Sequence, residues 1–237
     1  KNSHAYKRHA SLKLSTIFVS DIYFESSSQK DFFNSHVINV GPKSKISYVY
    51  YSDVVSASKQ PGVIFLEDKE IKVGLIGQFD TERRDYTVLL ELINRYGGDN
   101  VGFIQVGRFV DTPNNRRVRE LLADSVVFLK DDYTVGELDR LLMSCDVLLS
   151  LNDASKGYDK GKGTAAYGEA ISVRKPVVLP EFLTFNKEFS CFSYYYTDSS
   201  SLLSAIVSAS KCCECDSDIF STFKSSIVKN QILPVIN

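Results

Sequence analysis

The sequence predicts an α/β fold in which a doubly wound parallel sheet carries helices on both faces. From Ile71 onward, short apolar runs alternate with segments whose apolar residues recur at helical spacing. The segments between them are short, and alternation of this kind gives right-handed crossovers and a parallel sheet. Ligands of such sheets bind outside the carboxyl ends of the strands. The loops that follow the strands are therefore the candidate site.

Each element of this region follows from its own residues. Buried parallel strands are predicted from apolar runs at 71–77, 101–107, 125–129, 146–151 and 176–180, with a sixth at 193–197. Helices are predicted where apolar residues lie three or four positions apart, at 81–96, 114–123, 134–145, 201–209 and 219–228. Thr134 and Glu137 have the spacing of a capping box. A further helix carries Glu169 and ends at Arg174-Lys175-Pro176.

The first 70 residues are less regular. We expect a strand at 14–21, and the end of a helix and a short strand at 31–41. A linker is expected over 42–70; the pair Gly41-Pro42 marks its start, and it contains Pro61-Gly62. One strand–helix–strand unit is too small for a core of its own. We therefore expect 1–41 to be the remnant of a second Rossmann-like unit and 71–237 to be the main domain. The chain begins with Lys1, so we expect it to come from a longer polypeptide.

Composition narrows the functional classes. The net charge is −1, which predicts no nucleic-acid partner. No apolar run approaches the roughly 18 residues of a membrane span, so no transmembrane segment is expected. Five cysteines, an odd number, indicate reduced thiols and a cytoplasmic location. The Cys-rich run at 212–215 has no second ligand pair at suitable spacing, so we predict a turn there and no metal.

The segment KGKGTAAYGEAISVRKPVVLP, residues 160–180, carries the strongest functional signal. A Gly loop with Lys160 and Lys162 precedes small residues that favour a helix start. The N-terminus of a helix presents free N–H groups and a positive dipole end, which suit a phosphate. Glu169 lies on the same helix, where its carboxylate can hold sugar hydroxyls. We interpret this segment as a nucleotide-sugar site.

The segment YGEAISVRKPVVLPE at 167–181 is similar to the donor-site signature of GT-B-type glycosyltransferases, especially family 4. The segments 138–155 and 73–93 resemble the elements that precede that signature in the family. The resemblance covers about 71–230 and corresponds to the nucleotide-binding C-terminal half. Residues 11–41 more weakly resemble the end of the acceptor-side N-terminal half.

The resemblance implies a role for each matching residue. Glu169 corresponds to the carboxylate that holds the nucleotide ribose, and Arg83 or Arg84 to the basic residue that offsets the diphosphate charge. The donor-binding set also contains the loop residues Gly77, Lys162, Gly163 and Thr164. The stretch 126–133, with Phe128 and Lys130, occupies the place where the family reads the base. From the residues alone, each remains open to a structural reading as a solvated side chain, a loop or a helix cap.

The resemblance further implies transfer of a hexosyl group from a nucleotide diphosphate-sugar to a glycan or lipid-linked acceptor. No cofactor and no metal are expected, and the implied location is cytoplasmic, with peripheral contact at the inner membrane face allowed. The family takes its acceptor site and any general base largely from the N-terminal half. The catalytic residue is therefore unknown within this chain.

Two departures from the family leave an alternative open. Gly161 stands where the family usually has a second Glu, and Gln78 stands where it commonly has Arg. The alternative is a catalytically inactive domain that binds a nucleotide or phosphosugar. A receiver-type signalling domain is disfavoured because the first strand ends without an acidic pair, and an NAD-type site because no GxGxxG follows that strand. Arg116, Arg117 and Arg119 are interpreted as a solvated helix face.

Overall fold

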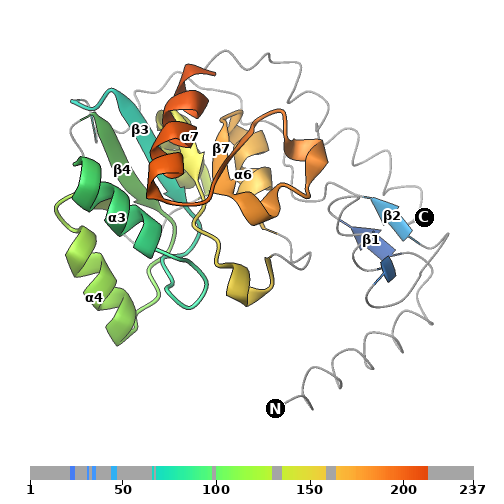
Figure 1. Ribbon diagram of the computed structural model, residues 1–237, viewed down its shortest axis with the longest axis horizontal. Helices are drawn as coiled ribbons and strands as arrows, with labels where there is room; N and C mark the ends of the chain where they lie inside the picture. Colours follow the sequence, from blue (N-terminus) through green and yellow to red (C-terminus); the bar gives the residue numbers. More distant parts are fainter. Residues whose placement is uncertain are drawn as a thin grey trace.

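The computed structural model describes residues 22–24, 31, 34–35, 44–46, 66, 68–97, 100–129, 135–158 and 164–212. Its main sheet has six parallel strands in the order β5-β4-β3-β6-β7-β8 (Figure 1). The predicted doubly wound parallel sheet is confirmed. Its strands are β3 (Ile71–Ile76), β4 (Val101–Val106), β5 (Val126–Phe128), β6 (Val147–Leu149), β7 (Val177–Pro180) and β8 (Ser193–Tyr196).

The strand order reverses between β3 and β6. Two halves of three strands each grow outward from this pair, which makes it the topological switch point where ligands bind in open α/β sheets. Val73 pairs with Val147 and Leu75 with Leu149 across the junction. The Asp146 carboxylate accepts a hydrogen bond from the Lys72 N–H at 2.8 Å and fixes this register. Because all strands run parallel, every loop that follows a strand lies at the same edge.

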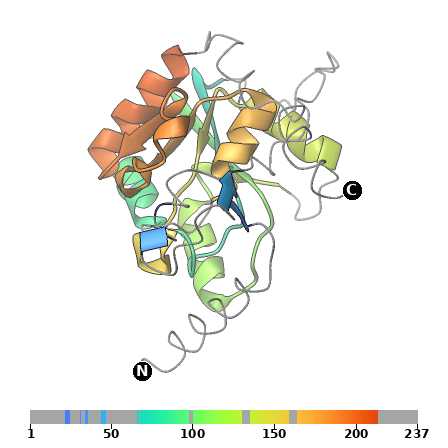
Figure 2. The same cartoon turned by 90° about the vertical axis from the view of Figure 1, so that its right-hand side faces the viewer.

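Helices cover both faces of the sheet, as the alternation predicts. On one face lie α3 (Thr87–Tyr96), α4 (Pro113–Leu122) and α7 (Ser199–Lys211), whose apolar side chains pack on those of Val73, Leu75 and Leu149. On the other lie α5 (Val135–Ser144) and α6 (Ala166–Val173). Figure 2 shows α7 and α5 on opposite sides of the strands. Short 3-10 helices complete the fold: η2 (Ala154–Lys156), η4 (Glu181–Leu183) and η5 (Lys187–Phe189).

One helix begins later than its sequence predicts. The expected helix 81–96 starts only at Thr87, because Asp80 organises the preceding residues into turns. Its carboxylate accepts from the Glu82 N–H at 3.0 Å, and its carbonyl accepts from the N–H groups of Arg83 and Arg84. Asp side chains compete with helices in this way. The two arginines consequently lie in the loop at the sheet edge and not in the first turn of a helix.

A separate two-stranded parallel sheet precedes this domain. It pairs β1 (Ile22–Phe24) with β2 (Ser44–Ile46). The latter strand falls within the range 42–70 that the sequence suggests is a linker, and the proposed domain boundaries stay a prediction. The strand expected at 14–21, the cap Thr134 and the helix expected at 219–228 lie outside the described residues.

Candidate functional site

The loop after β3 begins with two backbones in contact. Gly77 has φ +89° and Gly107 has φ +139°, conformations that glycine adopts without strain. A Cβ on Gly107 would collide with the Gly77 carbonyl, and the same carbonyl accepts a hydrogen bond from Gln105 Nε2 at 2.8 Å. The loops after β3 and β4 therefore pack directly against each other at the carboxyl edge.

The rest of this loop is fixed from both sides. Toward β4, the Phe79 N–H donates to the Arg108 carbonyl at 2.9 Å. Toward β6, Arg84 and Asn152 form an isolated antiparallel bridge, and the Asp85 N–H donates to the Leu151 carbonyl at 2.8 Å. Residues 79–85 thus cross the switch point as a rigid strap and not as a loose loop.

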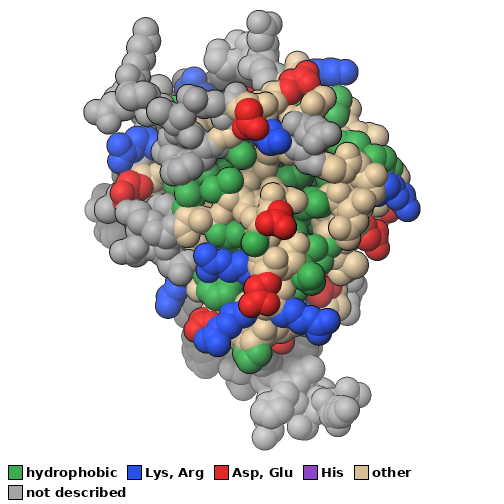
Figure 3. All heavy atoms as spheres, turned by 90° about the vertical axis from the view of Figure 1, so that its left-hand side faces the viewer, with side chains coloured by type: hydrophobic (Ala, Val, Ile, Leu, Met, Phe, Trp, Pro, Cys, Tyr) green, Lys and Arg blue, Asp and Glu red, His purple; other side chains and the backbone are tan. Residues whose placement is uncertain are grey.

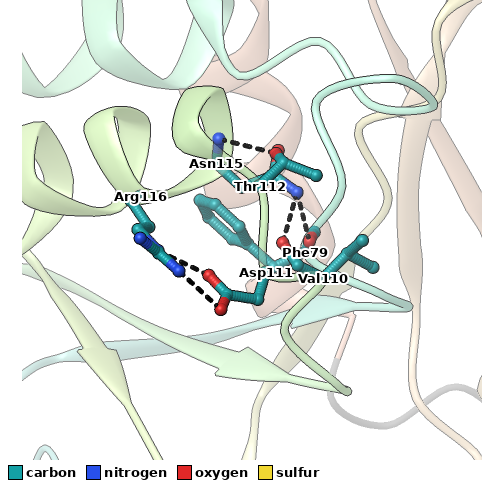
Figure 4. A network of polar contacts seen from close by, with 6 residues as sticks. All are labelled: Phe79, Val110, Asp111, Thr112, Asn115 and Arg116. Carbon is teal, nitrogen blue, oxygen red and sulfur yellow. Dashed lines mark hydrogen bonds and ion pairs between the residues drawn. The ribbon is translucent and has the colours of Figure 1, made fainter.

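Asn115 joins three segments beneath the strap. Its side chain is fully buried and its Nδ2 donates to the Val110 carbonyl at 2.6 Å and the Phe79 carbonyl at 3.5 Å (Figure 4). Its Oδ1 accepts from the N–H of Thr81 at 2.9 Å and from the Thr81 hydroxyl. The α4 N-terminus on which Asn115 lies is capped by Thr112. This single amide ties the β3 loop and the β4 loop to α4.

Arg84 lies at the centre of the edge. Its Nη1 donates to Ser150 Oγ at 2.9 Å, and Ser150 Oγ donates in turn to Asn152 Oδ1 at 2.7 Å. The guanidinium lies so close over Gly77 that a Cβ there would collide with it. Within the part of the chain that the structure describes, Arg84 forms no ion pair with a carboxylate at salt-bridge distance. Its charge is therefore held in place by neutral groups.

Glu169 approaches the same point from α6. It is the fourth residue of that helix and is half-buried. Burial raises the pKa of its carboxyl from 4.5 to about 7, and the charge of Arg84 opposes the rise. Glu169 is thus a carboxyl that exchanges its proton near neutral pH, beside a fixed guanidinium. Gly77 and Arg84 are in contact at the switch point, and Glu169 lies near enough for the Arg84 charge to lower the pKa of its carboxyl.

Arg83 has a different environment from that of Arg84. It is exposed, and its Nη2 donates to the hydroxyl of the buried Tyr158 at 3.2 Å. The sequence offers the two arginines as equivalent candidates. The structure places Arg84 at the junction and Arg83 at its rim.

The N-terminus of α6 is described only from Thr164. This residue is buried, its Oγ1 accepts from the Ala166 N–H at 3.4 Å, and the N-cap residue Ala165 makes no side-chain cap. Lys162 and Gly163, predicted to bind the donor phosphates, lie outside the described residues. Their roles stay predictions.

Phe128 ends the edge strand β5, which β4 separates from β3. Its ring meets that of Phe79 edge-on with centroids 5.4 Å apart, and the Arg119 guanidinium lies 5.0 Å from its centre. The side chain therefore serves packing on the α4 face. Base recognition by its backbone stays a prediction, and Lys130 lies outside the described residues.

Ser150, Asn152, Asn115 and Tyr158 are site residues that the sequence interpretation missed. For the first two a signal exists: in LLSLN (148–152) two polar residues interrupt the end of a buried apolar strand. Both are nearly inaccessible, at 0% and 3% exposed. Polar groups buried at a strand end point to a hydrogen-bond network.

The α4 face carries charges of both signs. Figure 3 shows basic and acidic side chains interspersed there. Arg116 forms a two-pronged ion pair with Asp111 at 2.6 and 2.7 Å, with both side chains largely exposed. Arg119 stacks between Phe109 and Phe128. Among the described residues no cluster of His, Cys, Asp and Glu could hold a metal, and no helix there is long and apolar enough to cross a bilayer.

Comparison with solved structures identifies the fold. A UDP-forming α,α-trehalose-phosphate synthase from Burkholderia xenovorans superposes with a TM-score of 0.59 at 14% identity, over 91% of this chain and 60% of that one. The corresponding enzyme from Burkholderia vietnamiensis gives 0.60 at 14% identity, over 91% and 58%. The catalytic domain of starch synthase IV from Arabidopsis thaliana, bound to ADP and acarbose, gives 0.56 at 12%, over 92% and 53%. The chain has the fold of GT-B glycosyltransferases.

This likeness concerns the fold, since the identities are low. No protein-family model matches the chain, and no curated protein matches its sequence. The chain spans 60% or less of the length of these structural neighbours. The GT-B part of the predicted resemblance is confirmed at this level, whereas nothing tests the assignment to family 4.

Proposed function

We propose that this chain is the nucleotide-sugar-binding half of a glycosyltransferase, which transfers a hexosyl group from a nucleotide diphosphate-sugar to a glycan or other acceptor. The observation that supports the proposal is the placement of Arg84 after β3 and Glu169 after β6, at the switch point of a GT-B-like sheet and near enough for the Arg84 charge to lower the Glu169 pKa. The donor is a substrate, so the proposed reaction needs no cofactor.

The two side chains suit the two parts of such a donor. Arg84 forms no ion pair at salt-bridge distance with a carboxylate of the described residues, and a guanidinium binds phosphate oxygens through two parallel hydrogen bonds. The carboxyl of Glu169 can accept hydrogen bonds from ribose hydroxyls. As the bond to the sugar breaks, negative charge grows on the leaving diphosphate, and a preorganised guanidinium stabilises it without reorganisation.

Calorimetry with nucleoside diphosphates tests the proposal. The parent chain should bind at least one of them, and Glu169→Ala should weaken the binding by roughly tenfold or more, as expected for losing hydrogen bonds of about 1–3 kcal/mol each. Ser172→Ala is a control on the same helix, since its hydroxyl donates to the backbone carbonyl of Glu169 and not to the Glu169 carboxyl. Equal affinity of the Glu169→Ala variant and the parent would contradict the assignment.

An inactive nucleotide- or phosphosugar-binding domain is the second candidate. Gln78, an exposed neutral side chain in the loop after β3, favours it, because the resembling family commonly has Arg there. Nucleotide binding without turnover in a longer protein that supplies the acceptor half would select this candidate. The proposed location is cytoplasmic, as the odd number of cysteines suggests.

A further inference from the structure

We propose that Ser150 and Asn152 are positioning residues that hold the Arg84 guanidinium in place for an anionic ligand. The inference rests on the proposed function for the nature of the ligand, a nucleoside diphosphate. The positioning itself rests on the chain of hydrogen bonds from Arg84 to Ser150 and from Ser150 to Asn152.

The direction of this chain follows from the donors available. A guanidinium has only donors, so Ser150 Oγ accepts from Arg84. The proton of the Ser150 hydroxyl then goes to an acceptor, and Asn152 Oδ1 lies 2.7 Å away. Asn152 Nδ2 is buried and has no partner within the described part of the chain. The amide oxygen of Asn152 therefore fixes the Ser150 hydroxyl, whereas burying the unpaired amide nitrogen costs free energy.

The groups that hold Arg84, the Ser150 hydroxyl and the Asn152 amide, are both neutral. A carboxylate in place of Ser150 would hold Arg84 as firmly, but it would also neutralise the charge that an anion needs. A hydroxyl fixed by an amide holds the guanidinium through geometry alone. Gly77 contributes by leaving room for the guanidinium above the backbone, and the Arg84–Asn152 bridge fixes the main chain at both ends.

The first measurement needs no ligand. In the full chain, the Nε–Hε signal of Arg84 in a 15N–1H NMR spectrum, assigned by its loss in Arg84→Lys, should show a rigid side chain. In the variants Ser150→Ala and Asn152→Leu, the same signal should show a mobile Arg84 side chain. Asn152→Asp keeps an acceptor for the Ser150 hydroxyl and should leave Arg84 rigid. Ser193→Ala is the matched control, since that serine is also buried and its Oγ has no partner among the described residues.

The second measurement uses UDP and ADP against the matching nucleosides. Ser150→Ala should weaken diphosphate binding by roughly tenfold or more, the range for a lost hydrogen bond to a charged group. Nucleoside affinity should stay that of the parent, which a general loss of structure would not allow.

The outcomes separate the two proposals. An Arg84 signal that stays rigid in Ser150→Ala and Asn152→Leu overturns the positioning role. If Ser150→Ala does not fold, the contrast between Asn152→Leu and Asn152→Asp decides in the same way. A parent chain that binds no nucleoside diphosphate overturns the proposed function, whereas the NMR result still decides the role of Ser150 and Asn152.

Discussion

Glu169 lies close enough to Arg84 for the guanidinium charge to oppose the rise that burial imposes on the carboxyl pKa. Burial dominates, so the folded chain holds the Glu169 carboxyl poised between its charged and neutral forms near pH 7. A fully exposed helix glutamate would not behave in this way. The pair also joins the two halves of the sheet, because Arg84 follows β3 and Glu169 follows β6.

The first prediction concerns pH and stability. The pKa of Glu169 is about 7 in the folded chain against 4.5 for the free group, so between these values the folded state binds more protons than the unfolded state. The free energy of unfolding should therefore fall as pH rises from about 4.5 to 7, by up to roughly 3 kcal/mol for this group. Glu169→Gln should flatten the dependence. Urea unfolding of both proteins at pH 4.5, 6 and 7.5 measures it, and parallel curves would exclude the effect.

The second prediction distinguishes the two arginines. Arg84→Ala should weaken nucleoside diphosphate binding by about tenfold or more, and Arg83→Ala by only about two- to threefold, because exposed charges contribute little. Neither change should alter the affinity for the unphosphorylated nucleoside. Titration calorimetry of both variants gives the comparison. A larger loss in Arg83→Ala would move the phosphate site to the rim beside Tyr158.

The third prediction uses two glycines with nearly equal φ angles. Gly77 has φ +89° and Gly157 has φ +87°, so alanine should cost each about 1 kcal/mol in backbone strain. A Cβ on Gly157 meets no atom of the described residues within 4 Å, whereas one on Gly77 meets the Arg84 guanidinium. Gly77→Ala should therefore lose about 1–2 kcal/mol more, the value of the displaced Arg84 hydrogen bond. Urea midpoints measure both, and equal losses would show that Arg84 moves aside freely.

The fourth prediction concerns the amide beneath the strap. Asn115→Ala should lower the free energy of unfolding by roughly 2–4 kcal/mol, since it leaves the Thr81 N–H without its partner and removes one of the two hydrogen bonds to the Val110 carbonyl. Asn114 is the adjacent control: it is exposed and donates one hydrogen bond to Thr81 Oγ1, so Asn114→Ala should cost under about 1 kcal/mol. A similar cost for both would mean that the strap does not depend on Asn115.

The fifth prediction concerns activity. The chain covers 60% or less of its structural neighbours, and the resembling family takes its acceptor site largely from the N-terminal half. We expect the isolated chain to bind donor nucleotide and to show little or no sugar transfer. Assays with nucleotide-sugars and a panel of glycan acceptors measure this. Robust transfer by these residues alone would refute it.

The sheet was predictable from the sequence because its strands are buried on both faces. Apolar runs such as 71–77 and 146–151 mark buried strands without ambiguity, and the alternation with helices sets the parallel order. The start of α3 was not predictable from apolar spacing. The apolar spacing of Val88, Leu89 and Leu92 is compatible with a helix that begins as early as Thr81. The hydrogen-bonded turns at Asp80 delay its start to Thr87.

The site was predictable in its residue types and not in its connections. Glu169 and the arginine pair follow from motifs, because each motif is local. The contact of Arg84 with Ser150 joins residues on either side of the switch point, and no local spacing reports it. Phe128 shows the same limit: the packing of its ring against Phe79 and Arg119 could not be read from local spacing, and base recognition by its backbone stays a prediction.

Because β3 pairs with β6, the proposed ligand site lies where the two halves of the sheet join. The two three-strand halves meet along this pair, and the Arg84–Asn152 bridge closes it at the carboxyl edge. A ligand that contacts Arg84 and Glu169 touches both halves at once, so it should restrain their separation more than it restrains the outer strands. Amide hydrogen exchange would register this as slower opening at Leu75 and Leu149, with little change at the far edge in β5. Ligand binding would thereby lower the rate of local opening of the central strands β3 and β6.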